Sequence, residues 1–406
     1  MSPPTAFFLS RYRAFAGEEV LPLRPLTLLY GRNNAGKNAV ARALAIFGAS
    51  LAENTSSALV IPPEILREGS FKDLAWRGDA GDYSFDLGLR WDAGQLREAR
   101  YTLDSASSRP AYIKELRLRD EDGTELWAGV TPPDRPMRPQ SGHVGEDVSF
   151  EGLLPQDPKV PILRELADRL ADLQGRIRWL GGLRTRQRRL IERGGGATLN
   201  LNADGSNAAS FLIERPHLLA DIKDFYAELT PARDLEVKEV LNLGHRITLN
   251  LKNQATFDID LVDTGEGMAQ VLPVLVAAAL AKHEEPGALL VVEEPENQLH
   301  PDAQALLARH LCRIAARPAP PTLVMETHSQ AFLLGVQLAV AKGLLPAERV
   351  GLVWVDQDAN GRSTITSVDL ESSGHPRAGW PVTALATELL LASELAEVNL
   401  KRAGDP

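Results

Sequence analysis

The sequence predicts an α/β fold with a mixed, largely parallel sheet, and three features lead to this class. An apolar run at 26–30, a glycine-bearing loop at 31–38 and an Ala- and Leu-rich segment at 39–47 follow one another as a strand, a loop and a helix. Apolar runs at 289–294 and 323–329 end in acidic residues or a histidine, as buried strands of an open sheet do. The C-terminal half alternates strand-like and helix-like segments, which predicts helices packed on the faces of that sheet.

The N-terminal half is predicted to contain strands, a first helix and an inserted β lobe. Strands are expected at 7–15 and 26–30, ahead of the helix at 39–47. Alternating apolar and polar residues from 82 to 127 predict an antiparallel lobe inserted after this helix. The Pro- and Arg-rich stretch at 132–145 is expected to be a loop.

The rest of the chain is predicted to return to helices and then to the sheet. The expected elements are helices at 163–177 and 208–229, strands over 237–262, alternating strands and helices to 341, strands at 350–355 and 365–368, and a terminal helix at 383–398. No internal repeat or low-complexity tract interrupts this order.

Composition excludes several classes of protein. The 406 residues are long enough for two or three domains, and 44% of them are apolar and 24% charged, which is ordinary for a globular chain. The net charge of −10 argues against a protein that coats nucleic acid over its whole surface. No apolar run approaches the roughly 20 residues that span a bilayer, and no signal peptide is evident. A single cysteine, Cys312, fits a reduced compartment, so we expect a cytoplasmic protein without a membrane partner.

The loop after the first buried strand has the pattern of a phosphate-binding loop. It reads Gly31-Arg32-Asn33-Asn34-Ala35-Gly36-Lys37-Asn38 and continues into Ala39. Its glycines let backbone amides curl around phosphates, the following helix N-terminus favours negative charge, and the lysine reaches the outer phosphates. The last position normally carries a Ser or Thr hydroxyl that binds Mg²⁺, and here it is Asn38. We therefore predict nucleotide binding, with weaker metal binding and slower turnover than usual.

Two acidic residues end the strand-like run at 289–294. In phosphoryl transfer, one carboxylate orders Mg²⁺ and its waters and the next polarises the attacking water, so Glu293 and Glu294 are candidates for these roles. His328, at the end of the next strand-like run, is placed to hydrogen-bond a terminal phosphate or that water. The alternatives are a solvated Glu-Glu-Pro turn and a structural histidine.

A second glycine-bearing loop at 263–270 precedes the helix predicted at 271–282. Amides at a helix start make an anion site, and one monomer needs only one phosphate cradle, so this loop suggests a nucleotide held between two subunits. A plain turn before a helix is the alternative.

An arginine cluster follows Trp179. We considered both a solvated face and contact with nucleic acid or phosphate for Arg184, Arg186, Arg188 and Arg189. No further aromatic residues are interleaved with them, so a base-stacking platform is not supported.

Together these motifs resemble the ABC-type ATPase heads of the SMC and RecF-like group, and most of all the OLD-family and related stand-alone ATPases of bacterial defence and DNA maintenance. The pieces that carry the resemblance are Arg11 to Phe15, Gly31 to Asn38, Asp263 to Gln270, Glu293 to Pro301, and Thr327 to Ser329. The likeness covers residues 1–50 and about 175–335. It implies an ABC-type head formed by 1–50 and 175–340, an inserted β lobe and helix at 51–174, and a small C-terminal domain at 345–406.

The resemblance also implies roles for individual residues. ATP and Mg²⁺ would be the ligands, with Arg13 and the loop from Gly31 to Ala39 on the nucleotide and Asn38 and Glu293 on the metal. Glu294 would be the hydrolytic base and His328 the switch histidine. The signature motif that reaches the partner subunit's nucleotide would consist of Gly265, Glu266, Gly267 and Gln270.

The functional expectation is an ATPase that dimerises around nucleotide, or forms a higher oligomer, and gates a separate effector such as a nuclease or toxin. OLD nucleases carry a following toprim domain, for which too little chain remains after Ser329. Two alternatives stay open, namely an ATP-bound scaffold that barely hydrolyses and a RecF-like DNA-repair ATPase. A P-loop kinase would explain neither the Gly265 loop nor His328.

Overall fold

The structure is a computed structural model that describes residues 2–381 with short gaps. The residues outside this description are 1, 53–54, 56, 67–68, 79–82, 107–108, 133–134, 141–144, 193–199, 242, 253–257, 284–286 and 382–406. The terminal helix predicted at 383–398 therefore lies outside the described residues. Within them, no helix is long and apolar enough to cross a membrane.

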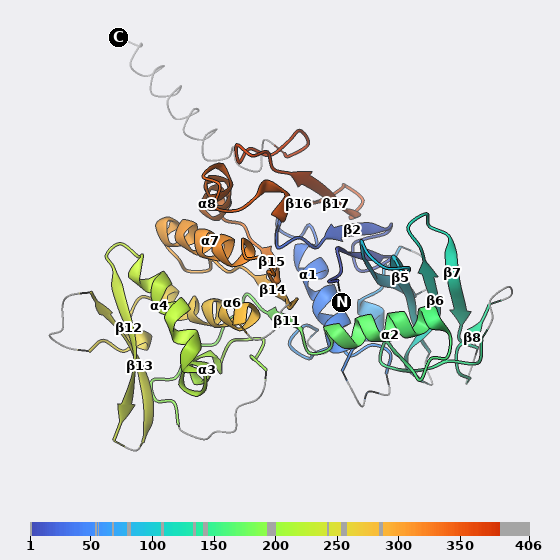
Figure 1. The fold of residues 1–406 in the computed structure, drawn as a ribbon, viewed down its shortest axis with the longest axis horizontal. Coiled ribbons are helices and arrows are strands. Elements are labelled where there is room, and N and C mark those ends of the chain that lie inside the picture. Colours follow the sequence, from blue (N-terminus) through green and yellow to red (C-terminus); the bar gives the residue numbers. More distant parts are fainter. Residues whose placement is uncertain are drawn as a thin grey trace, which may run out of the picture.

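A six-stranded sheet forms the centre of the molecule (Figure 1). In spatial order its strands are β11 (Ile177–Leu180), β14 (Leu289–Glu293), β15 (Thr322–Glu326), β3 (Leu26–Gly31), β16 (Val350–Gln357) and β17 (Ser363–Asp369). Neighbours are parallel except β16 and β17. The predicted mixed, largely parallel sheet is confirmed, and the two runs that end in acidic residues are adjacent strands.

Alternate side chains of the central strands enter two different cores. Leu290 and Val292 pack with helices α6 (Leu272–His283), α7 (Pro301–Ala315) and α8 (Gln330–Ala341). Leu289 and Val291 point the other way and pack with helix α1 (Lys37–Ala49). This two-sided burial explains why the strand is apolar at every position, since successive side chains of a strand face opposite sides of the sheet.

Beyond α1 lies a seven-stranded antiparallel sheet. Its spatial order is β2 (Glu19–Pro22), β1 (Ala6–Ser10), β4 (Phe85–Arg90), β5 (Glu98–Ala106), β6 (Arg109–Arg119), β7 (Glu125–Val130) and β8 (Arg138–Pro139). The predicted antiparallel lobe is present, but the N-terminal strands belong to it as well, because β1 pairs with β4. Helix α1 thus lies between two sheets (Figure 1).

Smaller elements complete the lobe. Helix α2 (Pro161–Leu173) packs its apolar face into the same core as α1, and it contacts the hairpin of β9 (Ser149–Glu151) and β10 (Leu154–Gln156). The helix predicted at 163–177 is confirmed, but it ends earlier, so that 177–180 can form edge strand β11 beside β14.

On the side of the central sheet opposite the antiparallel lobe, the chain forms helices and a β-hairpin (Figure 1). The helix predicted at 208–229 is two helices, α3 (Ala208–Glu214) and α4 (Leu219–Ala227), because Pro216 lacks the amide that a continuous helix needs. Strands β12 (Arg233–Val240) and β13 (Gly244–Leu251) form the hairpin, and the short helix α5 (Glu266–Gln270) precedes α6.

The strands that we assigned to a small C-terminal domain extend the head instead. Strand β16 pairs in parallel with β3, and β17 forms the sheet edge beyond it. Trp380 packs edge-on against Tyr30 and Trp354, with ring centroids 5.7 Å from each. Residues 350–369 are part of the central sheet, where β16 pairs with the backbone groups along one edge of β3. The outer limits of the other predicted units stay predictions.

Candidate functional site

The loop between β3 and α1 has the conformation that its glycines predict. Gly31 has a φ of 153°, Asn34 of 63° and Gly36 of 103°, and Gly36 is the residue just before α1. A Cβ atom at Gly31 would lie 2.2 Å from the carbonyl oxygen of Val355 on β16, so only glycine fits there. Arg32, Asn33 and Asn34 are exposed at the tip, whereas Ala35 and Ala39 are buried beneath it.

Lys37 lies inside this loop. Its Nζ donates to the carbonyl oxygens of Gly31 at 3.0 Å and of Arg32 at 2.9 Å, and the residue is 2% exposed. Burial lowers the pKa of Lys37, and the carboxylates of Glu326 and Glu294 act in the opposite direction. The ammonium group thus lies in the concavity where the loop amides would hold a phosphate.

The carboxylate of Glu293 is surrounded by hydrogen-bond donors. Arg42 binds it in a bidentate fashion, with Nε 2.8 Å from Oε1 and Nη2 2.9 Å from Oε2. The indole Nε1 of Trp179 donates to Oε1 at 3.0 Å, and Nδ2 of Asn38 lies 3.4 Å from Oε2. The sequence reasoning missed Arg42 and Trp179. The spacing of Arg42 from Asn38, one helical turn, was the available signal.

Glu294 is held in a strained conformation. Its φ is 46°, unusual for a residue with a side chain, and its amide donates to the Glu326 carbonyl at 2.7 Å. One Arg184 nitrogen, Nη2, donates to the carbonyl oxygens of Glu293 at 2.6 Å and of Glu294 at 2.8 Å. Strain that is fixed in this way at a strand end is typical of functional sites.

Arg184 is therefore not part of an exposed basic face; its Nε and Nη1 have no hydrogen-bond partner among the described residues, and its contact with phosphate stays a prediction. It is 8% exposed, and burial lowers its pKa to about 10 against the attraction of the glutamates around it. It fixes the backbone that carries Glu293 and Glu294. Both glutamates, together with Asn38, Arg42 and Arg184, line a hollow of 850 Å³.

A buried glutamate positions His328. Glu296 Oε1 accepts from the Thr327 hydroxyl at 2.7 Å and from the His328 amide at 2.9 Å, and burial raises the pKa of Glu296. His328 is exposed to solvent on one side. The protein atoms that cover the rest of its imidazole, together with the positive charge of Lys37, lower the pKa of His328. His328, Glu294 and the loop residue Asn33 line a second hollow of 690 Å³.

Glu326 is a further acid of the site that the sequence reasoning did not single out. It ends β15 beside Glu293, is fully buried, and has no hydrogen-bond partner for either carboxylate oxygen among the described residues. Burial, with Glu293 nearby, raises the pKa of Glu326 to about 8, and Lys37 opposes this. The carboxyl end of the sheet thus holds four glutamates, at 293, 294, 296 and 326, and three cations, Lys37, Arg42 and Arg184.

Arg13 lies in the turn before the loop. It has a φ of 48°, and its Nε and Nη2 are buried without a hydrogen-bond partner among the described residues. The neighbouring Phe15 ring lies where a Cβ atom at Gly36 would meet it at 3.1 Å. The turn therefore packs directly against the loop, while contact of Arg13 with nucleotide stays a prediction.

The predicted signature motif lies at the start of helix α5, apart from the phosphate-binding loop. Gly265 precedes α5, and a Cβ at Gly267 would lie 2.2 Å from the Gln298 carbonyl oxygen, so the motif is pressed onto the turn after Glu294. Gln270 Nε2 donates to Glu266 Oε1 at 3.0 Å.

The remaining arginines of the cluster are directed at this motif or at solvent. Arg189 donates to Asp263 Oδ2 at 2.6 Å and also binds Asp260, and these acids raise its pKa. Arg186 pairs with Glu266 at 3.3 Å, and Arg188 is exposed. The cluster is thus not a single basic face, because its members meet acids of a neighbouring loop that local sequence does not reveal.

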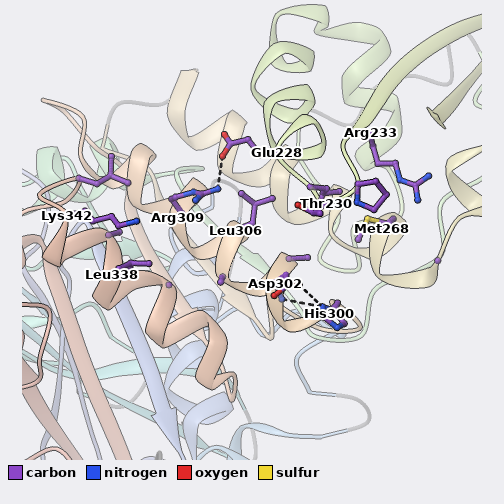
Figure 2. A pocket seen from close by; sticks show the side chains of 18 residues that line it. Glu228, Thr230, Arg233, Met268, His300, Asp302, Leu306, Arg309, Leu338 and Lys342 are labelled. Carbon is purple, nitrogen blue, oxygen red and sulfur yellow. Dashed lines mark hydrogen bonds and ion pairs between the residues drawn. The ribbon is translucent and has the colours of Figure 1, made fainter. Parts of the chain in front are cut away.

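The signature motif opens onto a different hollow from the phosphate loop. Figure 2 shows this groove of 530 Å³, in which Met268 lies across from Leu306 and Leu338, and Glu228 binds Arg309 at 2.8 Å. Gly265 lines this groove too, and no residue of the phosphate loop does.

The residues predicted to hold Mg²⁺ do not present a suitable donor set. Both oxygens of Glu293 accept hydrogen bonds, and Asn38 turns its amide nitrogen toward that carboxylate. Within the described residues, no group of three or more His, Cys, Asp or Glu side chains could hold a metal. Mg²⁺ takes oxygen ligands, and here the Glu293 oxygens already accept hydrogen bonds while Asn38 directs a nitrogen toward them, so these two residues as arranged do not fit it.

The fold has the mixed α/β architecture of an SMC head, with a glycine-bearing loop between β3 and α1 as in P-loop proteins. Residues 180–334, which include the predicted signature motif, Glu294 and His328, match the family model described as AAA domain, putative AbiEii toxin, Type IV TA system. The comparison with curated proteins gives no match.

One solved Smc head shares the fold at low sequence identity, and two further SMC heads are more distantly similar. A crystal structure of an Smc head bound to the C-winged helix domain of ScpA aligns with 91% of this chain and 99% of its own, with a TM-score of 0.51 and 12% identity. The SMC head domain from Thermotoga maritima aligns with 91% of this chain and 99% of its own, with a TM-score of 0.44 and 13% identity. An Smc head with an extended coiled coil, bound to the C-terminal domain of ScpA and derived from Pyrococcus furiosus, aligns with 91% of this chain and 97% of its own. Its TM-score is 0.47 and its identity 11%.

Proposed function

We propose that this protein is an ATP-binding head that dimerises head to tail around two nucleotides and acts as a switch, or slow ATPase, for a separate effector. One observation carries the proposal: the phosphate loop and the signature motif line different hollows of the same chain. Each is half of a nucleotide site, and a second copy placed head to tail would supply the other half.

The chemistry of each half site supports ATP turnover. Lys37 and the loop amides would bind the phosphates, and the helix N-terminus of α1 would add favourable charge. Glu294 would polarise the attacking water from a backbone that Arg184 holds in place. His328 would contact the terminal phosphate, since Glu296 fixes its amide beside the hollow that His328 shares with Glu294.

The proposal of a separate effector rests on the resemblance of this chain to other protein families. The match to a family described with a putative toxin of a toxin–antitoxin system, and the likeness to OLD-family ATPases, favour a nuclease or toxin as partner, in phage defence or DNA maintenance. A RecF-like repair role is less favoured, because the arginine cluster that suggested nucleic-acid contact is largely engaged within the protein.

Dimerisation can be tested without disturbing the monomer. A Cβ at Gly265 meets no heavy atom within 4 Å, so Gly265→Val should fold normally yet block the approach of a partner's nucleotide. Gly17→Val is the matched control, since Gly17 is equally unobstructed and lies outside the motif. We would measure the mass of the full chain by light scattering, with and without ATP, in a Glu294→Gln background that slows hydrolysis.

The expected result is an ATP-dependent dimer for Glu294→Gln alone and with Gly17→Val, and a monomer with Gly265→Val. A chain that stays monomeric with bound ATP in every case would contradict the head-to-tail site.

A second function is favoured by the hydrogen bonds that occupy the Glu293 carboxylate. Its engaged carboxylate, together with Asn38, supports an ATP-bound scaffold that assembles an effector complex with little hydrolysis. A radiolabelled turnover assay with the partner present separates the two. If Glu294→Gln leaves complex assembly and release unchanged, hydrolysis is not part of the function.

A further inference from the structure

We propose that Arg42 occupies the Glu293 carboxylate at which a divalent cation would be held, so that this head binds ATP without a metal ion. The inference rests on the proposed nucleotide binding and concerns why Glu293 is not available to a metal. It assigns to Arg42 a role in the site that follows from its contacts with Glu293.

The first argument is the geometry of the pair. Two N–H groups of Arg42 meet the two oxygens of Glu293 at 2.8 and 2.9 Å, the fork-to-fork arrangement that makes arginine–carboxylate pairs strong. The Glu293 side chain is 2% exposed and that of Arg42 28%. A metal ion at Glu293 would have to displace two charge-assisted bonds in a protected setting, where such bonds are stronger than at the surface.

The second argument is that the pair is held from both sides. Trp179 donates to Glu293 Oε1, and its ring lies 5.9 Å from the guanidinium carbon of Arg42, within reach of a cation–π contact. Asn38, at the position where a metal-binding hydroxyl is usual, directs its amide nitrogen to the other oxygen. The side chains that hydrogen-bond to this carboxylate are thus all donors, which suits a hydrogen-bonded carboxylate better than a metal ligand.

The third argument is the position of Arg42 on the helix that follows the phosphate-binding loop. Arg42 lies one turn after Asn38 on α1, whose N-terminus is the phosphate loop, and both residues line the hollow that contains Glu294. Arginine has five N–H donors, so the pair with Glu293 leaves N–H groups for a phosphate oxygen. Arg42 also neutralises Glu293, whose negative charge would otherwise repel the nucleotide.

The test compares ATP affinity of the full chain in EDTA and in Mg²⁺, by isothermal titration. For the natural sequence we expect Kd values that agree within about threefold. Arg42→Gln should weaken binding in EDTA by about tenfold or more, because a charged donor pair is lost, and Mg²⁺ should restore part of it. Arg24→Gln is the matched control, since Arg24 is also paired with a carboxylate, Asp369, but lies outside the site.

The outcomes separate this inference from the proposed function. If the chain binds no ATP in either buffer, the proposed nucleotide site itself is wrong. If it binds ATP in Mg²⁺ and loses it in EDTA, the function stands and the inference is overturned, since the metal then displaces Arg42. Equal binding of Arg42→Gln and the natural chain in EDTA would overturn it as well.

A second readout avoids dependence on the folding of one variant. Mn²⁺ binding to the ATP complex of the natural chain can be followed by electron paramagnetic resonance. We expect the protein to leave the affinity of ATP for Mn²⁺ unchanged or lower it, whereas a markedly tighter Mn²⁺ site in the ternary complex would refute the inference.

Discussion

His310 offers a quantitative test of how helix α7 is packed behind the site. It lies in the middle of this helix, is 7% exposed, and meets the Phe225 ring edge-on at a centroid distance of 6.1 Å. Burial lowers the pKa of His310 to about 4, because a charged imidazole is poorly solvated there. The folded protein therefore holds His310 neutral at pH values where the unfolded chain protonates it.

The charged groups around His310 come from three helices. Asp221 on α4 and Glu228 just after it favour the charged form, whereas Arg313 on α7 and Lys282 on α6 oppose it. Burial outweighs them all, so the net direction is downward.

The sign and size of the pH effect follow from these values. An unfolded histidine titrates near pH 6.5, so the stability due to neutral His310 is fully present above that pH and is lost as the pH falls toward 4. The difference between the two pKa values corresponds to about 3.4 kcal/mol at the acid limit and about 2 kcal/mol at pH 5.

Urea unfolding at pH 7.5 and pH 5 measures this loss. His310→Leu keeps the volume roughly constant and cannot titrate, so between the two pH values its free energy of unfolding should fall by about 2 kcal/mol less than that of the natural chain. His375→Leu, at an exposed position, is the control and should follow the natural chain. If His310→Leu and the natural chain lose the same stability, the buried neutral state of His310 is refuted.

Three further substitutions test the site and its support. Asn38→Ser should raise steady-state ATPase activity and Mg²⁺ affinity by restoring a hydroxyl, and no gain in either would contradict this. Gly31→Ala should destabilise the fold by about 2–4 kcal/mol in thermal melts, since its Cβ would lie 2.2 Å from a β16 carbonyl; Gly17→Ala, which meets nothing within 4 Å, should be near neutral. Arg184→Met should cost about 2–4 kcal/mol through orphaned carbonyls, whereas Arg188→Met at an exposed position should not.

The sequence was sufficient for those parts of the fold that local pattern determines. The run from Leu289 to Val292 is apolar at every position, which is typical of a strand covered on both faces, and the structure places helices on both sides of it. The conformation of the 31–38 loop was predictable because Gly31 and Gly36 have positive φ angles that few other residues adopt.

Long-range pairing was not predictable from pattern. Strand β1 looks like any short apolar strand, and its choice of β4 over β3 as a neighbour is decided by tertiary packing. Arg184 was taken for part of a charged face because its partners, two backbone carbonyls of the 289–294 strand, lie about a hundred residues away. Arg42 was missed for the same reason, since its significance appears only when α1 is placed beside Glu293.

Asn38 and Arg42 should act as a unit, and a double-mutant cycle can show it. Asn38→Ser restores a metal-binding hydroxyl but leaves Glu293 bound to Arg42, so alone it should raise Mg²⁺ affinity only modestly. Arg42→Gln frees the carboxylate but leaves an amide in place of the hydroxyl. The double variant provides both oxygens, and its gain in Mg²⁺ affinity for the ATP complex should exceed the sum of the single gains by about 1 kcal/mol or more, as expected of side chains that share one partner. Strictly additive gains would mean that the arginine and the asparagine act on the metal site independently, and that Glu293 does not couple them.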